Sequence, residues 1–166
     1  DTTSDESQFS LQLCDLDASL ALGSVFPLGM KFSSAYFSPE AAVWHSNETL
    51  LGAKAVDSAQ PLHVAPTLDV WSLGVVLYEI CTGRHLFAQD MGNDNMVDPS
   101  DLQRLCLWLG PSDEALVHCF RGGGEDEVDA TVQCTPQQRS DAQHLIRWCL
   151  QGDPQLRPSL SQILSH

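Results

Sequence analysis

Two carboxylates stand close together near the start of the chain. Asp15 and Asp17 follow residues 9–14, in which apolar and polar side chains alternate as they do in a half-buried strand. Carboxylates at the carboxyl end of a buried strand are suited to holding a hard cation or to acting on a bound substrate. An acidic turn or a helix cap would use the same residues, so spacing alone leaves these interpretations open.

Other reactive residue types are scattered. None of the 6 cysteines forms a Cys-x-x-Cys pair, which indicates reduced, buried thiols in an intracellular protein rather than disulfides or a zinc site. The glycines at 122–124 lack the spacing and the preceding strand of a phosphate-binding loop. Ser24, Ser33 and Ser34 are candidate phosphorylation sites, although solvated loop serines give the same pattern.

The elements that must position these residues are organised around one apolar run at residues 67–83. Pro66 precedes it, Thr67 is the expected N-cap, and Gly83 can end it in a left-handed conformation. Its apolar residues on several faces are Val70, Trp71, Leu73, Val75, Val76, Leu77 and Ile80. We therefore expect a core helix buried on nearly every side. A run of about 15 residues is short for a membrane span, and Asp69 and Glu79 lie within it.

The rest of the chain predicts a mainly α fold with one or two short strands at the N-terminal end. Residues 1–10 are polar and predict a loop or a disordered start, and residues 18–36 and 45–65 are irregular. Further helices are expected at 38–44, 98–110, 112–120 and 135–152, with an acidic loop at 89–97. A turn at 153–154 leads into a last helix with Leu160, Ile163 and Leu164. In the helix at 98–110, the residues Leu102, Leu105 and Leu109 repeat at helical spacing.

The charge balance restricts the partners. The chain of 166 residues carries 8 Lys+Arg against 22 Asp+Glu, a formal net charge of -14. Such a surface repels nucleic-acid phosphates and anionic membranes, so we expect neither as a partner. No apolar segment of signal-peptide or membrane-span type is found, and we expect one cytoplasmic domain.

Four stretches, in this order, resemble the C-terminal lobe of a eukaryotic-type protein kinase. The metal-binding Asp-Phe-Gly motif resembles Asp-Leu-Asp-Ala-Ser at 15–19, and the Ala-Pro-Glu motif resembles Tyr-Phe-Ser-Pro-Glu at 36–40. The start of the family's central helix resembles Asp-Val-Trp-Ser-Leu-Gly-Val at 69–75. The closing Asp-Pro-x-x-Arg-Pro resembles Asp-Pro-Gln-Leu-Arg-Pro at 153–158. The resemblance covers residues 11–166 and implies an activation segment at 15–40 and an insertion at 46–66.

The resemblance assigns chemistry to the first motif. It implies that Asp15 binds Mg²⁺ and, through it, the phosphates of ATP. Leu16 stands where the family has Phe and should keep an apolar anchor. Asp17 stands where the family has Gly, which makes the turn stiffer, and its carboxylate either assists metal binding or repels phosphate.

The other motifs imply docking and structural roles. Ser33 and Tyr36 fall where the family docks a protein substrate. Glu40 and Arg157 resemble a buried ion pair that joins the activation segment to the lower lobe. Asp69 resembles an aspartate that accepts hydrogen bonds from the catalytic-loop backbone, although a first-turn acid favoured by the helix dipole would look the same.

Several parts of a working kinase are not found in this sequence. The Gly-rich loop, the strand Lys with its helix Glu, and the His-Arg-Asp loop precede the Asp-Phe-Gly motif in the family, but only 14 residues precede Asp15. No catalytic base is therefore assigned, and we expect the chain alone to transfer no phosphate.

Three hypotheses about function remain. The chain is the lower lobe of a protein Ser/Thr kinase that uses ATP and Mg²⁺, with Ser33 favouring Ser/Thr over Tyr as the residue that is phosphorylated. Alternatively, it is a pseudokinase-type module that binds a protein without catalysis, which Leu16 and Asp17 favour. A third interpretation is an unrelated all-helical binding domain. The sequence immediately upstream of residue 1 would discriminate the first two.

Overall fold

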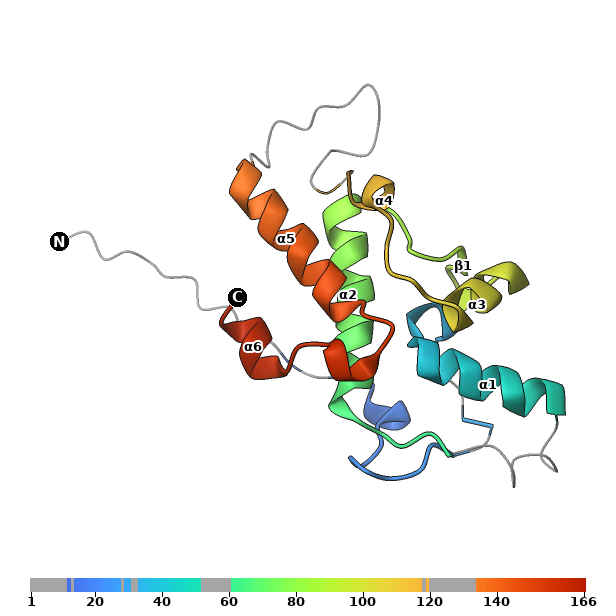
Figure 1. Cartoon of the computed structure of the whole chain (residues 1–166). Helices are drawn as coiled ribbons and strands as arrows, with labels where there is room; N and C mark the ends of the chain where they lie inside the picture. The colour runs from blue at the N-terminus through green and yellow to red at the C-terminus, as the bar shows by residue number, and fades with distance from the viewer. Residues whose placement is uncertain are drawn as a thin grey trace.

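The computed structural model describes residues 12, 14–27, 29–30, 33–51, 61–117, 119 and 134–166 (Figure 1). Its α-helices are α1 Pro39–Leu51, α2 Pro66–Thr82, α3 Pro99–Cys106, α4 Asp113–Val117, α5 Pro136–Cys149 and α6 Leu160–Leu164. Shorter elements are the 3₁₀ turns η1 Leu16–Ala18, η2 Ser34–Tyr36 and η3 Pro154–Leu156, and the strands β1 Gln89–Asp90 and β2 Asn95–Met96. The predicted mainly α fold with one or two short strands is confirmed, but the two described strands lie at 89–96 and not at the N-terminal end. Most of the strand expected at 9–14 and all of the polar start at 1–10 lie outside the described residues.

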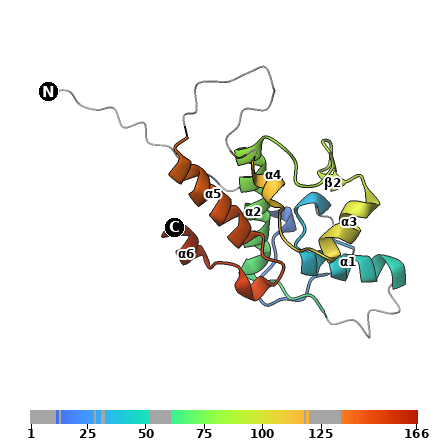
Figure 2. The ribbon, with the colours of Figure 1, turned by 45° about the horizontal axis from the view of Figure 1, so that its top comes forward.

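Helix α2 is the centre of this arrangement, and α5 lies along it (Figures 1 and 2). It ends as predicted at Gly83, whose φ of 66° is left-handed and whose N–H donates to the Glu79 carbonyl at 2.9 Å. Its start differs from the prediction, because Ala65 and not Thr67 is the N-cap. Pro66 takes the first helical position, where its missing N–H leaves no hydrogen bond unmade.

The core forms where α2 meets α5 and α3. Trp71 is fully buried, with Leu105 of α3 and Ile146 of α5 in the same hydrophobic cluster. At Gly74 the two helices approach so closely that an added Cβ would lie 2.8 Å from Cβ of Cys149. Only glycine fits this crossing without displacing α5.

One side of α2 remains open, contrary to the expectation of burial on nearly every side. Ile80 is 72 % exposed and Val76 is 38 % exposed. Together with half-buried Leu73 they form a stripe at helical spacing that no described residue covers.

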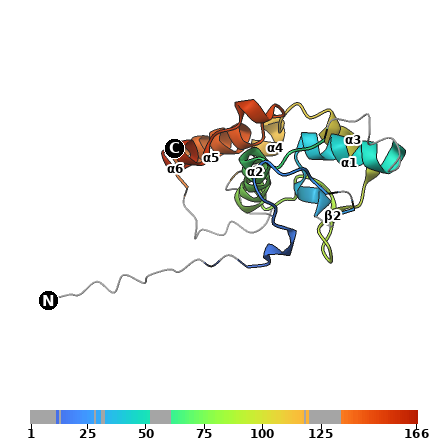
Figure 3. The same ribbon diagram turned by 90° about the horizontal axis from the view of Figure 1, so that it is seen from below.

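Several segments differ from the predictions, and α4 ends at Val117, before the expected residue 120. Helix α1 runs to Leu51, well beyond residue 44, and so enters the expected insertion at 46–66, of which 52–60 lie outside the described residues. Helix α3 ends at Cys106, and Leu109 is fully exposed instead of core. The predicted loop at 89–97 contains the antiparallel β1–β2 hairpin, which projects beside η2 (Figure 3).

The first part of the chain is tied to the segment that leads into α2. Val25 and His63 form an isolated antiparallel bridge. The N–H of Gly23 donates to the Val64 carbonyl, and the N–H of Phe26 donates to the Leu62 carbonyl, both at 2.8 Å. These bonds hold residues 23–26 against the start of α2.

Within the described residues, no helix is long and apolar enough to cross a membrane.

Candidate functional site

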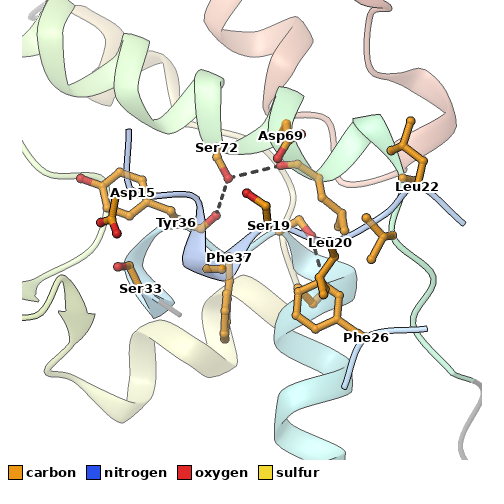
Figure 4. Close-up of a pocket in the computed structure, with 16 residues that line it drawn as sticks. Asp15, Ser19, Leu20, Leu22, Phe26, Ser33, Tyr36, Phe37, Asp69 and Ser72 are labelled. Atoms are coloured by element: carbon orange, nitrogen blue, oxygen red, sulfur yellow. Dashed lines mark hydrogen bonds between the residues drawn. The ribbon is translucent and has the colours of Figure 1, made fainter. Parts of the chain in front are cut away.

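A pocket of about 460 Å³ lies between the first residues of the described chain, η2 and the first turns of α2 (Figure 4). Four residues singled out in the sequence line it, namely Asp15, Ser33, Tyr36 and Asp69. They come from three segments that are far apart in sequence. The pocket therefore brings the proposed metal ligand and the proposed docking residues to one place.

The chain turns sharply at Asp15. This residue has φ 59° and ψ 55°, a left-handed conformation that aspartate tolerates better than most non-glycine residues. Asp17 follows within η1 and is not among the described non-glycine residues with positive φ, so replacing the family glycine causes no backbone strain at that position. Leu16 is 61 % exposed, so it is not the apolar anchor that was expected.

The carboxyl groups of Asp15 and Asp17 face one another. A hydrogen bond with Asp17 and the repulsion between the two carboxylates raise the pKa of Asp15 above its ordinary value. Both residues are exposed, and a cation would relieve their repulsion as protonation does. The pair thus concentrates negative charge beside the pocket, which Asp15 lines and Asp17 does not.

This donor set fits Mg²⁺ carried by a nucleotide. Magnesium in such sites takes one or two carboxylates and fills its remaining positions with phosphate oxygens and water. Nowhere among the described residues do three His, Cys, Asp or Glu side chains gather into a metal site. Asp15 and Asp17 would therefore hold a cation shared with a ligand and do not form a complete metal centre by themselves.

Tyr36 forms one end of the pocket, near Asp15 and Ser33 in Figure 4. Its hydroxyl donates to Oε2 of Glu79 at 3.3 Å, and its carbonyl accepts from Oγ of Ser72 at 3.2 Å. Burial, and then the Glu79 carboxylate, raise the pKa of Tyr36, so the phenol stays a donor at neutral pH. Glu79 is a site residue that sequence reasoning missed, because nothing in the spacing links it to a tyrosine 43 positions earlier.

Asp69 lies in the first turn of α2, on the wall of the pocket. Its side chain is exposed, and within the described part of the chain no group hydrogen-bonds to it. The carboxylate is therefore available to donors from elsewhere. Its position is equally that of an acid favoured by the positive end of the helix dipole.

Glu40 and Arg157 meet in a bidentate salt bridge. The Arg157 Nη1 donates to Oε1 and Nη2 to Oε2 of Glu40, both at 2.7 Å. The Arg157 side chain is completely buried, and that of Glu40 is 23 % exposed. This pair joins the start of α1 to the segment after η3, across 117 positions of sequence.

The remaining donors of Arg157 bind backbone carbonyls. Nε donates to Gln151 at 2.8 Å, Nη1 to Thr67 at 2.8 Å and Nη2 to Gly152 at 3.3 Å. With the two bonds to Glu40, these make five hydrogen bonds, one for each N–H of a guanidinium. The Arg157 Cζ also lies 5.1 Å from the centre of the Trp71 ring. A buried charge with every donor used is well stabilised.

The fold agrees with what comparison with known proteins finds. The family model described as "Protein kinase domain" matches residues 4–166, and the chain belongs to this family. A mouse TBC domain-containing protein kinase-like protein is 27 % identical over 139 residues, and the human protein of that name is 29 % identical over 139 residues. Each match covers 84 % of this chain but only 13 % of the relative's length.

Proposed function

We propose that this chain is the C-terminal lobe of a kinase domain that transfers the terminal phosphoryl group of ATP to Ser or Thr of a protein. Transfer requires the lobe to be joined to an N-lobe and a catalytic loop. The observation that carries the proposal is the meeting of Asp15, Ser33 and Tyr36 at one end of the pocket. A group that holds phosphate through a cation and a segment that holds a protein substrate must be close together for transfer.

Each residue has a distinct part in this function. Asp15, assisted by Asp17, would hold Mg²⁺ and so orient the phosphates, and the cation would supply positive charge against the phosphoryl group. Ser33 and Tyr36 form the wall against which the protein substrate lies. Glu40 and Arg157 act at a distance from the chemistry by fixing the end of the activation segment.

The open side of α2 supports docking of a further part of the domain. Leu73, Val76 and Ile80 present an apolar stripe, and Asp69 at its N-terminal end lacks a hydrogen-bond partner among the described residues. An exposed apolar stripe that ends in an available carboxylate suits a polypeptide segment that offers both apolar side chains and backbone N–H groups. We place the missing catalytic loop there, in a domain that acts on proteins in the cytoplasm.

A second candidate function is protein binding without catalysis. Asp17 favours it, because a second carboxylate beside Asp15 repels phosphate whenever no cation lies between them. The mouse and human relatives are named kinase-like, which agrees with this alternative. In that case the pocket end at Ser33 and Tyr36 would bind a partner protein.

Phosphoryl transfer by the full-length protein tests the two functions. The assay follows labelled phosphate from ATP to a mixture of Ser/Thr peptides at millimolar Mg²⁺. Under the first proposal Asp15→Asn lowers transfer about a hundredfold or more, because the cation loses its ligand. The matched control Asp141→Asn, which changes an exposed aspartate of α5, leaves transfer intact. Absence of transfer by the unaltered protein would reject the first function and favour the second.

A further inference from the structure

The β1–β2 hairpin is bound to residues 33–36, here called the docking segment. The N–H of Ser34 donates to Oδ1 of Asn95 at 3.1 Å, and the N–H of Met96 donates to Oγ of Ser34 at 2.8 Å. The N–H of Ala35 donates to the Asp94 carbonyl at 3.1 Å. Three hydrogen bonds thus join the hairpin to the 3₁₀ turn η2, on the backbone and the side chain of its first residues.

The hairpin is itself held in a fixed shape. Asp94 has a φ of 55°, a left-handed conformation that is costly for most non-glycine residues but tolerated by aspartate. Its N–H donates to the Asp90 carbonyl at 2.8 Å, and the N–H of Asn95 donates to Oδ1 of Asn93 at 3.0 Å. Asn95 therefore presents its amide oxygen to Ser34 from a pre-formed turn.

The base of the hairpin is anchored to α3. The N–H of Ala88 donates to Oδ2 of Asp101 at 3.0 Å, and the N–H of Val97 closes the hairpin on the Ala88 carbonyl at 3.0 Å. Asp101 is only 9 % exposed and pairs with Arg104 at 3.1 Å. A buried carboxylate of a core helix thus fixes the point from which the hairpin reaches the docking segment.

The first strand reaches the same segment through side chains. Nε2 of Gln89 lies 2.9 Å from Nδ1 of His85. That His85 nitrogen also lies 3.0 Å from Oε1 of Glu79, whose other oxygen accepts from the Tyr36 hydroxyl. Strand β2 therefore contacts the backbone of the docking segment directly, whereas β1 is linked to the Tyr36 hydroxyl through His85 and Glu79.

We propose that the β1–β2 hairpin clamps the docking segment, with Asn95 as a positioning residue that sets the place of Tyr36 through the backbone of Ser34. The role of this clamp in substrate binding rests on the proposed function. It predicts that the protein substrate, and not ATP, is the ligand whose binding depends on Asn95. Among the interactions of the described residues, the hairpin does not contact the Asp15 turn. A change at Asn95 should therefore affect binding of the protein substrate and leave binding of ATP unchanged.

A spectroscopic experiment on the 166-residue chain tests the clamp without any need for catalysis. The chain has only 2 tyrosines, so ¹³Cζ-tyrosine labelling gives two resonances, which Tyr78→Phe assigns. With Asn95→Ala we expect the Tyr36 resonance to move toward that of free tyrosine and the Ser34 amide to exchange on the order of tenfold faster, because one hydrogen bond is lost. Asn95→Asp keeps an acceptor oxygen and should retain the slow exchange.

The controls make the result decisive. Asn47→Ala changes an exposed asparagine of α1 and should alter neither readout. Ser34→Ala removes the acceptor for Met96 and is judged by the same readouts, so a failure of one variant to fold leaves the other decisive. A folded Asn95→Ala or Ser34→Ala chain with an unmoved Tyr36 resonance would overturn the clamp.

Kinetics on the full-length protein then separate the clamp from the proposed function. Where transfer is found, Asn95→Ala should raise KM for the protein substrate and leave KM for ATP unchanged. Equal effects on both, or on neither, would count against the clamp even though transfer itself is present. A moved Tyr36 resonance in a protein that transfers no phosphate would keep the clamp and reject the function.

Discussion

The junction at Arg157 and the turn at Asp15 are built in opposite ways. The Arg157 guanidinium is buried, and all five of its donors are bonded within the described chain. Asp15 is exposed, and its side-chain partner is Asp17, another acid. The chain therefore completes the contacts that hold the lobe together, while the contacts that would meet a nucleotide depend on something else.

The largest expected effect is a loss of stability at the Arg157 junction. Arg157→Ala should lower the free energy of unfolding by about 3–5 kcal/mol, because it leaves the Glu40 carboxylate and three carbonyls without their donor. Denaturant unfolding measures the change. Arg84→Ala, at an exposed arginine whose side chain forms no salt bridge with described residues, should stay within about 0.5 kcal/mol. Similar losses for the two variants would remove the distinction drawn for Arg157.

A smaller loss is expected at the helix crossing beneath the junction. Gly74→Ala would place Cβ 2.8 Å from Cβ of Cys149 and 2.9 Å from Cδ2 of Leu150, so α2 and α5 must shift apart. The cost is about 1–3 kcal/mol, the range for overpacking a dense core. Gly92→Ala, in the hairpin turn beside a movable aspartate side chain, serves as the matched control and should change little. An undiminished unfolding free energy for Gly74→Ala would mean that the crossing is looser than its geometry implies.

At the Asp15 turn, a substitution should change the titration of a carboxyl group and hardly change the free energy of unfolding. Asp17→Asn removes the neighbouring carboxylate, so the pKa of Asp15 should fall toward its ordinary value in ¹³C carboxyl NMR. Asp98, whose pKa is lowered by its hydrogen bonds from Ser100, is an internal reference that should not move.

The sign of the accompanying pH dependence follows from the raised pKa. The folded chain binds the Asp15 proton more tightly than the unfolded chain, so this contribution to stability is present below the ordinary aspartate pKa and is lost as pH rises through the raised value. Solvent screens an exposed pair, so the loss is small. An Asp15 titration that is unchanged in the Asp17→Asn chain would show that the two carboxyls do not interact.

The smallest effect is expected for nucleotide on the isolated chain. Millimolar Mg-ATP should leave its Tm unchanged, because two exposed carboxylates do not hold a nucleotide without the other half of a kinase site. A rise in Tm that Asp15→Asn abolishes would show that the described pocket binds nucleotide by itself. That result would erase the contrast between the two regions.

The sequence predicted elements where a local signal is strong. Pro66 and Gly83 bracket α2, and Thr135 begins α5 with a capping box in which its side chain accepts from the N–H of Gln138. The apolar residues on several faces of α2 predicted burial on nearly every side, which is right at Trp71 and wrong at Ile80. Ile80 is exposed because no described segment packs on its face of α2, and a local pattern does not reveal which segments will pack together.

Features that depend on long-range pairing were beyond a local pattern. Leu109 fits the helical spacing of α3, yet the helix stops at Cys106 and the side chain points to solvent. The β1–β2 hairpin has only two residues in each strand, too few to give an alternating pattern. In the pocket, the resemblance pointed to Asp15 and Ser33, whereas the bonds to Tyr36 from α2 became visible only in three dimensions.

The salt bridge across 117 positions also has a consequence for how the protein is made. At about 5–20 residues per second, a ribosome delivers Arg157 on the order of 10 s after Glu40. Throughout that interval the start of α1 exists without the guanidinium that completes it. A nascent chain interrupted before Arg157 therefore leaves the lobe incompletely folded, and apolar surface exposed in such a state is what chaperones bind.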